Sequence, residues 1–454
     1  MAKDGGAVRE RIVTLGNWPF ALIHRLYHAA VPHERRLIFW SWRRRKTFHL
    51  RLLRESLRRD LVDACQAEIR QILSRHPDAP GVVIFPPSVP WYTELFQRPQ
   101  QMARGFTSLG YVVLYWVEDI DKQDESIRFR EVGTRLYLCK VPPSAFWVCK
   151  RPIFISYTYN YQWQSLLRAP IIIYEMIDHL SIFSNFPMSA LRRYHRRLLR
   201  RADLVVGTAD DLLAELKPER SDAILCPNGV DLEHFAAIAD AREDDIPADL
   251  RSIVATEQPV IGYYGAMAEW FDFDLVKYAA KALPNFQFVL IGPDYDGLTM
   301  RKAGIGDYAN IHWLGSKAYK ELPQYLACFD VATIPFKVSD ALNAVSPIKL
   351  FEYMAGERPI VTTDLTECRK YPIVLIARNQ EEWTQRLQEA VGLRGDQAYR
   401  ERLRSAAEAN TWVTRALTEI KGLEARNVIA PHTHPLVLPQ ASGHVAIQER
   451  ASAK

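Results

Sequence analysis

Short runs of apolar residues alternate along the chain with longer amphipathic stretches. The first series of runs covers residues 81–85, 111–116, 135–138, 153–156, 171–175 and 204–207. The second series covers residues 259–265, 287–292, 311–314, 331–334 and 359–363. Short apolar runs bounded by turn residues are typical of buried strands, and strands that alternate with helices indicate parallel sheets. The pattern therefore predicts an α/β protein with two Rossmann-like domains that face a cleft, because such sheets bind ligands beyond the carboxyl ends of their strands.

One helix of the second series is marked at both ends. Ser346 is expected to cap it, Pro347 to be its first residue, and Gly356 to close it. The free N–H groups and the positive dipole end of such a helix suit a phosphate. Glu352 lies about two turns further on among apolar residues, where a carboxylate is costly to bury unless a partner such as a ligand hydroxyl binds it. A glutamate that faces solvent is the alternative.

A length of 454 residues exceeds a single hydrophobic core and fits two domains with extensions. The predicted segments are a basic, aromatic helical extension (1–78), a first domain (79–230), a hinge passage (231–258), a second domain (259–395), closing helices (396–427) and a tail (428–454). Within these, residues 50–75 read as a polar amphipathic helix, and residues 382–394 and 398–424 as the two closing helices. Pro, Ser, Gly and Gln in the tail predict disorder.

The cysteines and the N-terminus indicate a cytoplasmic protein. The six cysteines show no C-x-x-C or zinc spacing, which favours reduced thiols. The start of the chain lacks a signal-peptide pattern, and no apolar run approaches the length of a membrane-spanning helix.

Positive charge is concentrated at the N-terminus. The first 60 residues carry fourteen Lys and Arg against five Asp and Glu, a net charge of +9, whereas the whole chain carries +5. Trp and Phe beside arginine clusters suit a helix in a lipid headgroup layer, so we expect an anionic membrane surface as partner and no nucleic acid. Residues 190–201, with six arginines among Leu and Tyr, suit the same surface. Aromatics packed on the body of the protein, and a solvated helix face, are the respective alternatives.

The stretch from Ser346 to Gly356, SPIKLFEYMAG, resembles the donor-site helix of family-4-type glycosyltransferases with the GT-B fold. The similarity is to a teichuronic-acid and exopolysaccharide type of subgroup, whose motif reads sPlKlfEYmAaGkPvV. In this chain Gly356 comes one residue earlier than the family's glycine, and Glu357 takes that place. The resemblance also includes a hinge motif at 227–231 and the first strand and Gly loop of a donor domain at 259–265. It covers about residues 80–395.

The resemblance implies a nucleotide-sugar site in the second domain. Glu352 would accept hydrogen bonds from the donor ribose, and the base would lie along residues 313–316. The start of the helix would hold the diphosphate, with Lys349 adding positive charge. The full set of expected donor contacts is Gly265, Trp313, Gly315, Lys337, Asn343, Ser346, Pro347, Ile348, Lys349 and Glu352.

Two departures from the family pattern affect this site. Ala344 stands where the family's first Glu would contact the transferred sugar, and Asp340 or Asn343 could substitute for it. The family's basic pair for the diphosphate is also absent after the Gly loop. Lys337 or Lys349 is the expected replacement.

The first domain should supply the acceptor side. Asp178 and His179 fall where many relatives place a strand-end histidine, and with Lys349 they are the predicted catalytic residues. A helix N-cap is the alternative role for Asp178. Arg98 is expected to meet an anionic acceptor or the donor phosphates, unless it is only a surface arginine at a helix start.

Two D-x-D strings, at 272–274 and 294–296, read as loop acids, and we expect neither a metal nor another cofactor. The predicted function is that of a hexosyltransferase-type glycosyltransferase, retaining by resemblance. It would transfer a sugar from a nucleotide-diphosphate sugar to a glycan or lipid-linked acceptor in cell-envelope polysaccharide biosynthesis, at the inner face of the membrane. A catalytically silent GT-B scaffold and a GT-B sugar-nucleotide epimerase are the alternatives.

Overall fold

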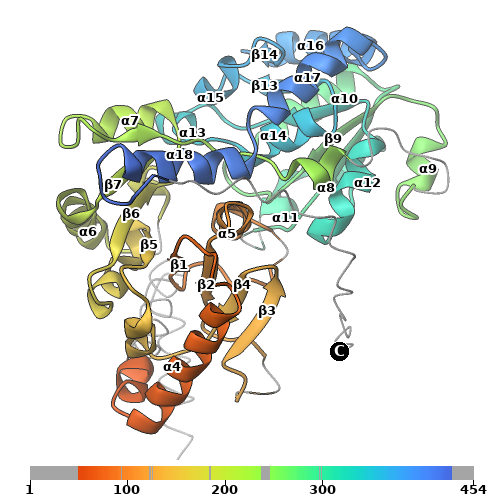
Figure 1. The fold of residues 1–454 in the computed structure, drawn as a ribbon. Helices are drawn as coiled ribbons and strands as arrows, with labels where there is room; N and C mark the ends of the chain where they lie inside the picture. Colours follow the sequence, from red (N-terminus) through yellow and green to blue (C-terminus); the bar gives the residue numbers. More distant parts are fainter. Residues whose placement is uncertain are drawn as a thin grey trace, which may run out of the picture.

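The computed structural model describes residues 50–431 except 94, 122–123, 125, 184–185, 237–245, 296 and 298. Most of the predicted basic extension (1–49) and of the predicted tail (432–454) lies outside the described residues. The described chain forms two α/β domains side by side (Figure 1).

The first domain contains an eight-stranded sheet with the order β3-β4-β2-β1-β5-β6-β7-β8. All neighbours are parallel except β3 and β4. The strands are β1 (Val82–Phe85), β2 (Val112–Trp116), β3 (Phe129–Gly133), β4 (Leu136–Cys139), β5 (Ile153–Ser156), β6 (Ile171–Met176), β7 (Leu204–Gly207) and β8 (Ile224–Leu225). The six predicted strands are confirmed to within a residue or two at each end. β3 and β8 were not predicted, because β3 is a half-exposed edge strand and β8 has two residues.

The second domain contains a six-stranded parallel sheet with the order β11-β10-β9-β12-β13-β14. Its strands are β9 (Val260–Tyr264), β10 (Gln287–Ile291), β11 (Ile311–Trp313), β12 (Val331–Ile334), β13 (Ile360–Thr363) and β14 (Leu375–Ala377). The strand order reverses between β9 and β12, and this reversal opens a crevice at the carboxyl ends of the two strands. The predicted α/β class and the two Rossmann-like domains are therefore confirmed.

Helices cover both faces of each sheet. In the first domain, α5 (Arg98–Ser108) and α18 (Trp412–Glu424) pack on one face, and α4 (Arg59–Ser74), α6 (Met188–Arg201) and α7 (Asp210–Leu216) pack on the other. In the second domain, α14 (Ile348–Ala355) packs against α17 (Gln397–Glu408) and α8 (Leu232–Ala236), and α10 (Phe273–Ala282) packs against α16 (Gln380–Leu393). Strands covered on both faces consist mostly of apolar residues, and for this reason the sequence shows them as apolar runs.

Helix α4 belongs to the first domain. The domain therefore begins before residue 79, where the sequence analysis placed its start. Its residues Cys65, Ile69 and Ile72 are buried against β1 and β2. Because these residues follow helical spacing, they form one apolar stripe, which packs against the sheet.

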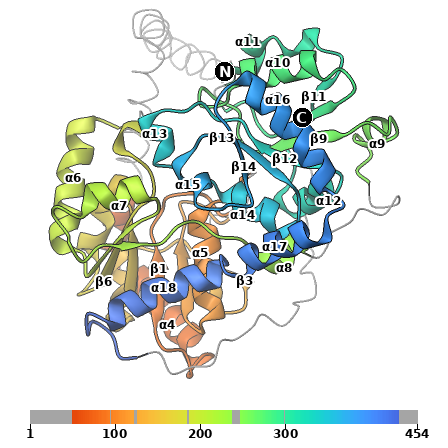
Figure 2. The same cartoon turned by 90° about the horizontal axis from the view of Figure 1, so that it is seen from above.

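The predicted single helix 398–424 is wrong, because the chain breaks it at residues 409–411. The Thr411 side chain accepts a hydrogen bond from the Thr414 N–H and starts α18 there. Helix α17 stays with the second domain, whereas α18 crosses to the first and packs on α5 (Figure 2). The chain thus returns to the first domain through α18 alone.

The two segments that connect the domains pair with each other. The Val230 N–H donates to the Asn410 carbonyl at 3.0 Å, and the Trp412 N–H donates to the Val230 carbonyl at 3.1 Å. A Cβ on Gly229 would lie 2.8 Å from the Asn410 carbonyl oxygen, so only glycine fits between the two strands of this hinge.

Glu357, which takes the place of the family's glycine, has a left-handed φ of 55°. Its carboxylate is buried and accepts from Arg400 Nε at 2.9 Å and from Arg404 Nε at 2.7 Å. A non-glycine residue is strained at such a φ. The two ion pairs to α17 offset that strain and tie the end of α14 to α17.

Candidate functional site

The crevice between β9 and β12 is lined by glycines that bring two loops into contact. Gly265 follows β9 with a φ of 141°, and Gly292 follows β10 with a φ of 138°. A Cβ on Gly292 would lie only 1.9 Å from the Gly265 carbonyl oxygen. The two loops therefore pack backbone against backbone, which requires glycine at both positions.

The side chain of Lys349 reaches into this crevice from the start of α14. A Cβ on Gly265 would lie 3.2 Å from Lys349 Nζ, which places the ammonium group against the Gly loop. The ammonium also lies 5.4 Å from the ring centroid of Tyr263 and 5.0 Å from that of Phe336. Burial lowers the pKa of Lys349 to about 8, although the nearby Glu352 carboxylate acts in the opposite direction. Among the described residues, no carboxylate pairs with this ammonium.

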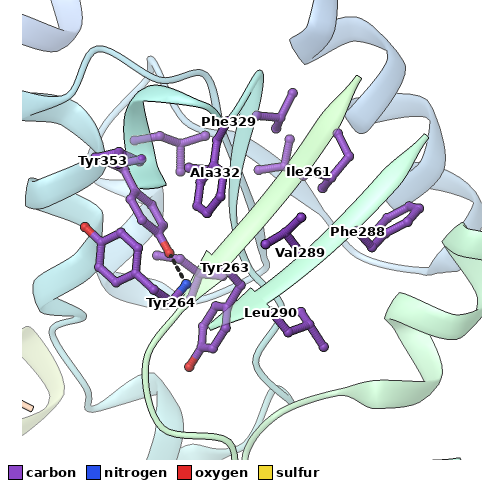
Figure 3. Packing of buried hydrophobic residues seen from close by; sticks show 14 of the residues in the cluster. Ile261, Tyr263, Tyr264, Phe288, Val289, Leu290, Phe329, Ala332 and Tyr353 are labelled. Carbon is purple, nitrogen blue, oxygen red and sulfur yellow. Dashed lines mark hydrogen bonds between the residues drawn. The ribbon is translucent and has the colours of Figure 1, made fainter. Parts of the chain in front are cut away.

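Glu352 lies one turn further along α14 and points into the protein. Its side chain is buried, so a glutamate that faces solvent is wrong. Burial raises its pKa to about 7, against the lowering effects of the neighbouring Tyr264 side chain and of the Lys349 charge. Figure 3 shows Tyr264 beside Tyr353, whose hydroxyl accepts a hydrogen bond from the Tyr264 N–H at 3.2 Å. A ligand hydroxyl that donates to this carboxylate would offset the cost of its burial.

The start of α14 differs from the prediction by one residue. Pro347 occupies the N-cap position and makes no side-chain cap, and the helix begins at Ile348. Ser346 instead contacts the hinge: its hydroxyl accepts from the Asn228 N–H at 3.2 Å, and its carbonyl accepts from Asn228 Nδ2 at 2.6 Å. In the part of the chain that the structure describes, the N–H groups of Ile348 and Lys349 have no acceptor, so they remain available to an anion.

The other predicted donor residues surround the crevice unevenly. Trp313 is 44% exposed, and its Nε1 donates to the Gly292 carbonyl at 2.9 Å. The Gly292 N–H in turn donates to the Gly315 carbonyl at 2.8 Å, so residues 313–315 border the Gly loops. Lys337 is exposed and donates to the carbonyl of Glu269 at 2.7 Å, whereas Lys349 meets Gly265 directly. Of the two lysines expected to replace the family's basic pair, Lys349 has the fitting position.

Position 344 faces the first domain. Ala344 is buried and belongs to an apolar cluster with Met176 and Leu180 of the first domain. Asn343 ends the short helix α13 (Asp340–Asn343), and its buried Oδ1 has no hydrogen-bond partner. Asp340 is exposed at the start of that helix. Asn343 is thus better placed than Asp340 to substitute for the family's first glutamate.

Asp178 and His179 follow the carboxyl end of β6. The predicted alternative for Asp178 was a helix N-cap, but His179 occupies the N-cap position. His179 caps the short turn η3 (Leu180–Ile182): its ring accepts from the Ser181 N–H, and Nδ1 lies 2.7 Å from the Ser181 hydroxyl. Asp178 is half-buried and has no hydrogen-bond partner among the described residues. Burial raises its pKa to about 7. Asp178 is therefore the residue of the two that remains available to a substrate.

Arg98 is buried and bonded inside the protein, so the alternative of a surface arginine is wrong, and its contact with an acceptor or the donor phosphates stays a prediction. Its guanidinium binds Glu175 Oε1 at 2.8 Å from Nε and 2.5 Å from NH2, and Glu419 Oε1 at 3.2 Å. NH1 donates to the Pro227 carbonyl at 3.0 Å and to Asn228 Oδ1 at 3.2 Å. The cluster joins α5, β6, α18 and the hinge. The sequence contained one signal for it, a glutamate at position 175 inside a buried strand.

The first D-x-D string lies at the start of a helix, and the second is described only in part. Asp272 is the N-cap of α10 and accepts from the Leu275 N–H at 2.9 Å, which confirms its reading as a loop acid. Asp296 lies outside the described residues. No group of three or more His, Cys, Asp or Glu side chains with metal-binding geometry occurs in the described ranges.

Residues 258–391, which contain the crevice, Lys349 and Glu352, match the family model described as glycosyl transferases group 1. Over these residues the second domain is similar to the glycosyl transferases of group 1. The predicted resemblance is therefore confirmed for this part of the chain.

The match to one curated relative is longer than the match to the family model. The chain is 27% identical over 241 residues to TuaH of Bacillus subtilis strain 168, which is assigned by inference as a teichuronic acid biosynthesis glycosyltransferase. The match covers 51% of this chain and 59% of that protein, less than two thirds of its length.

Two solved structures share the fold of this chain over about three quarters of its length. A sucrose-phosphate synthase from Thermosynechococcus elongatus superposes with a TM-score of 0.59 at 14% identity, covering 77% of this chain and 99% of that chain. Anabaena HepE in complex with UDP-glucose gives a TM-score of 0.56 at 14% identity, with coverages of 76% and 100%. Both identities are low, so these structures establish the GT-B fold and nothing further.

Besides the contacts at the hinge, hydrogen bonds and an ion pair join the two domains across the cleft. The Asp210 N–H, at the start of α7, donates to Glu367 Oε1 of the second domain at 2.8 Å. Lys370 Nζ lies 2.9 Å from Asp210 Oδ2, and Gln101 Nε2 donates to the Tyr319 hydroxyl at 2.7 Å. Glu367 is buried, so its bond to Asp210 is shielded from water and holds the domains together.

We expect Glu367→Ala to open the cleft of the ligand-free protein. Loss of this buried charge-assisted bond should weaken the closed state by about 1.5–3 kcal/mol. Small-angle X-ray scattering should then show a larger radius of gyration. Glu389→Ala removes an exposed glutamate that pairs with Arg386 in the same domain, and it serves as the control. Identical scattering from both variants and the parent would show that Glu367 does not control closure.

Proposed function

We propose that the protein is a hexosyltransferase-type glycosyltransferase that transfers a sugar from a nucleotide-diphosphate sugar to a glycan or lipid-linked acceptor. The observation that carries this proposal is the crevice of the group 1 domain, where Lys349 lies against Gly265 and Glu352 lies one turn behind. The complex of HepE with UDP-glucose supports UDP-sugars as the first donors to test. The naming of TuaH supports a cell-envelope polysaccharide as the product, and retention of configuration follows from the resemblance alone.

The donor would be held by three kinds of group. Its diphosphate would accept hydrogen bonds from the N–H groups of Ile348 and Lys349 and an ion pair from the Lys349 ammonium. Glu352 would accept from a ribose hydroxyl, and the base would lie by Trp313. The helix end and the ammonium stabilise the leaving diphosphate without help from a metal, so we expect EDTA to leave the activity unchanged.

The acceptor would enter from the first domain. Asp178 follows the carboxyl end of β6, and burial raises its pKa to about 7, which allows it to accept a proton from an acceptor hydroxyl at neutral pH. We place the reaction in the cytoplasm at the inner face of the membrane, with the extension 1–78 and residues 190–201 toward the lipid. No helix among the described residues is long and apolar enough to cross a bilayer.

A catalytically silent scaffold is the second candidate, and Ala344 favours it. The residue that would carry the family's first carboxylate is a buried alanine packed on the first domain. A protein that binds nucleotide without transferring a sugar would fit this feature.

A thermal-shift screen tests the proposal. The full-length protein is heated with UDP, GDP, ADP and CMP and with their common sugars, alone and as Glu352→Ala. Ligand at about 100 times its Kd stabilises a protein by about 2.7 kcal/mol, so one nucleotide family should raise Tm clearly. The increase should be absent in Glu352→Ala and present in Glu408→Ala, which removes an exposed glutamate of α17. No shift with any nucleotide would overturn the donor site, and binding without turnover would favour the scaffold.

A further inference from the structure

The six arginines of α6 form an exposed face that the donor site does not use. This arginine face consists of Arg192, Arg193, Arg196, Arg197, Arg200 and Arg201, all exposed. On the opposite side, Leu191, His195, Leu198 and Leu199 are buried and attach the helix to the first sheet. The arginines come in three adjacent pairs spaced four residues apart.

This arrangement is unfavourable for the isolated protein. Arginines four residues apart on a helix repel one another, and the arginine face contains four such pairs. None of the six side chains pairs with a carboxylate in the described part of the chain. Arg193 and Arg197 instead lie over the rings of Tyr194 and Tyr161, at 5.5 and 5.8 Å. Within the described ranges no carboxylate neutralises this charge, so an external anion would be a favourable partner.

A second exposed feature lies where the described chain begins. Leu50, Leu53 and Leu57 are 48%, 38% and 83% exposed and follow helical spacing, whereas Leu52 is buried. We call these three residues the leucine stripe. Arg54, which is exposed, lies within the same stretch. Exposed leucines combined with arginines are typical of helices that lie in the headgroup region of a membrane.

The arginine face and the leucine stripe belong to the same layer of the first domain. Leu52 packs in one cluster with Phe154 of β5, and α6 packs in a cluster with Ile172 of β6. Phe154 and Ile172 are register partners on adjacent parallel strands, so their side chains point to the same face of the sheet. Both features therefore cover one face, opposite the face that carries α5 and α18.

We propose that this layer of the first domain docks on an anionic lipid bilayer, with the arginine face against the headgroups and the leucine stripe inserted between them. The inference rests on the proposed transfer to an acceptor at the membrane, and it specifies the surface that brings the protein there. The leucine stripe favours a bilayer over a soluble polyanion, because a charged chain in water offers nothing apolar to bury it. Helix α6 also contacts η3, the turn that follows Asp178, so docking brings the acceptor side of the cleft close to the lipid.

Vesicle sedimentation of the full-length protein tests the surface. The vesicles contain phosphatidylcholine with about 30% phosphatidylglycerol, or phosphatidylcholine alone. The test variant is Arg192→Gln/Arg193→Gln/Arg196→Gln/Arg197→Gln, because glutamine keeps the helix propensity. The control removes the same charge from exposed positions of the second domain, as Lys281→Gln/Arg301→Gln/Lys302→Gln/Lys320→Gln. A third variant, Leu50→Ser/Leu53→Ser/Leu57→Ser, tests insertion.

The parent and the charge control should bind anionic vesicles, and the arginine variant should lose about a hundredfold or more in partition coefficient. The leucine variant should lose about tenfold or more and keep its salt dependence. Equal binding of parent and arginine variant would overturn the proposal. The proposal would also be overturned if the parent did not bind vesicles but bound heparin through the same arginines, since the partner would then be a soluble polyanion. Nucleotide thermal shifts, measured on the same variants, report separately on the donor site.

Discussion

Arg98→Met is expected to lower the free energy of unfolding by about 3–5 kcal/mol, because removal of one partner leaves buried charges without compensation. Arg98 is 3% exposed, and its guanidinium lies between Glu175 and Glu419, which are also buried. The same side chain holds the Pro227 carbonyl at the hinge. Its loss should therefore weaken the attachment of α18 as well as the first domain. Thermal unfolding followed by circular dichroism measures the change in Tm.

Arg104→Met on the same helix is the matched control. Arg104 is half-exposed and makes one ion pair, to Asp231 at 3.3 Å. Exposed pairs of this kind contribute about 1 kcal/mol or less, so its Tm should change little. Equal effects of the two substitutions would show that the buried cluster is not important for stability.

The stability of the protein should depend on pH through Glu419 of this cluster. Burial raises the pKa of Glu419 well above its ordinary value of 4.5, and the neighbouring Glu175 carboxylate raises it further. The native protein then keeps a proton that the unfolded chain releases above pH 4.5, so stability falls as the pH rises through that range. Glu419→Gln imitates the protonated acid, and its Tm should therefore decline less between acid and neutral pH than that of the parent.

The sheets were predictable from the sequence because each buried strand is an apolar run. The strands that were missed have the opposite character. β3 alternates half-buried and exposed residues at a sheet edge, and β14 has three residues of which one is buried. The break between α17 and α18 was missed although Thr411 and Thr414 carry its capping signal. The amphipathic pattern continues across the break, and so the pattern alone indicated one helix.

The candidate site was predictable where its residues are adjacent in the sequence. Lys349 and Glu352 lie on one short helix with a recognisable motif, where Lys349 meets the Gly loop and Glu352 is buried one turn further on. The role of Arg98 depends on Glu419, which is 321 positions away, and no local pattern reports such a contact. The neighbours of Ala344 are likewise residues of the other domain.

Lys349→Met is expected to weaken the binding of a nucleoside diphosphate by about 10–100-fold, since an ion pair to a diphosphate contributes about 1.5–3 kcal/mol. The binding of the parent nucleoside, which lacks the diphosphate, should stay the same. Isothermal titration with both ligands separates the two contributions. Equal losses for nucleoside and nucleoside diphosphate would mean that the substitution damages the crevice as a whole.

The pH profile identifies the charge that is responsible. Burial lowers the pKa of Lys349 to about 8, so in the empty site the ammonium deprotonates above that pH and diphosphate affinity should fall. Glu352, with a pKa raised to about 7, becomes protonated below that pH and should weaken binding on the acid side. The affinity of the parent should therefore be highest between about pH 7 and pH 8. In Lys349→Arg the guanidinium stays charged, so the alkaline decline should disappear while the acid decline remains. An alkaline decline that persists in Lys349→Arg would assign the titration to another group and remove Lys349 from the diphosphate site.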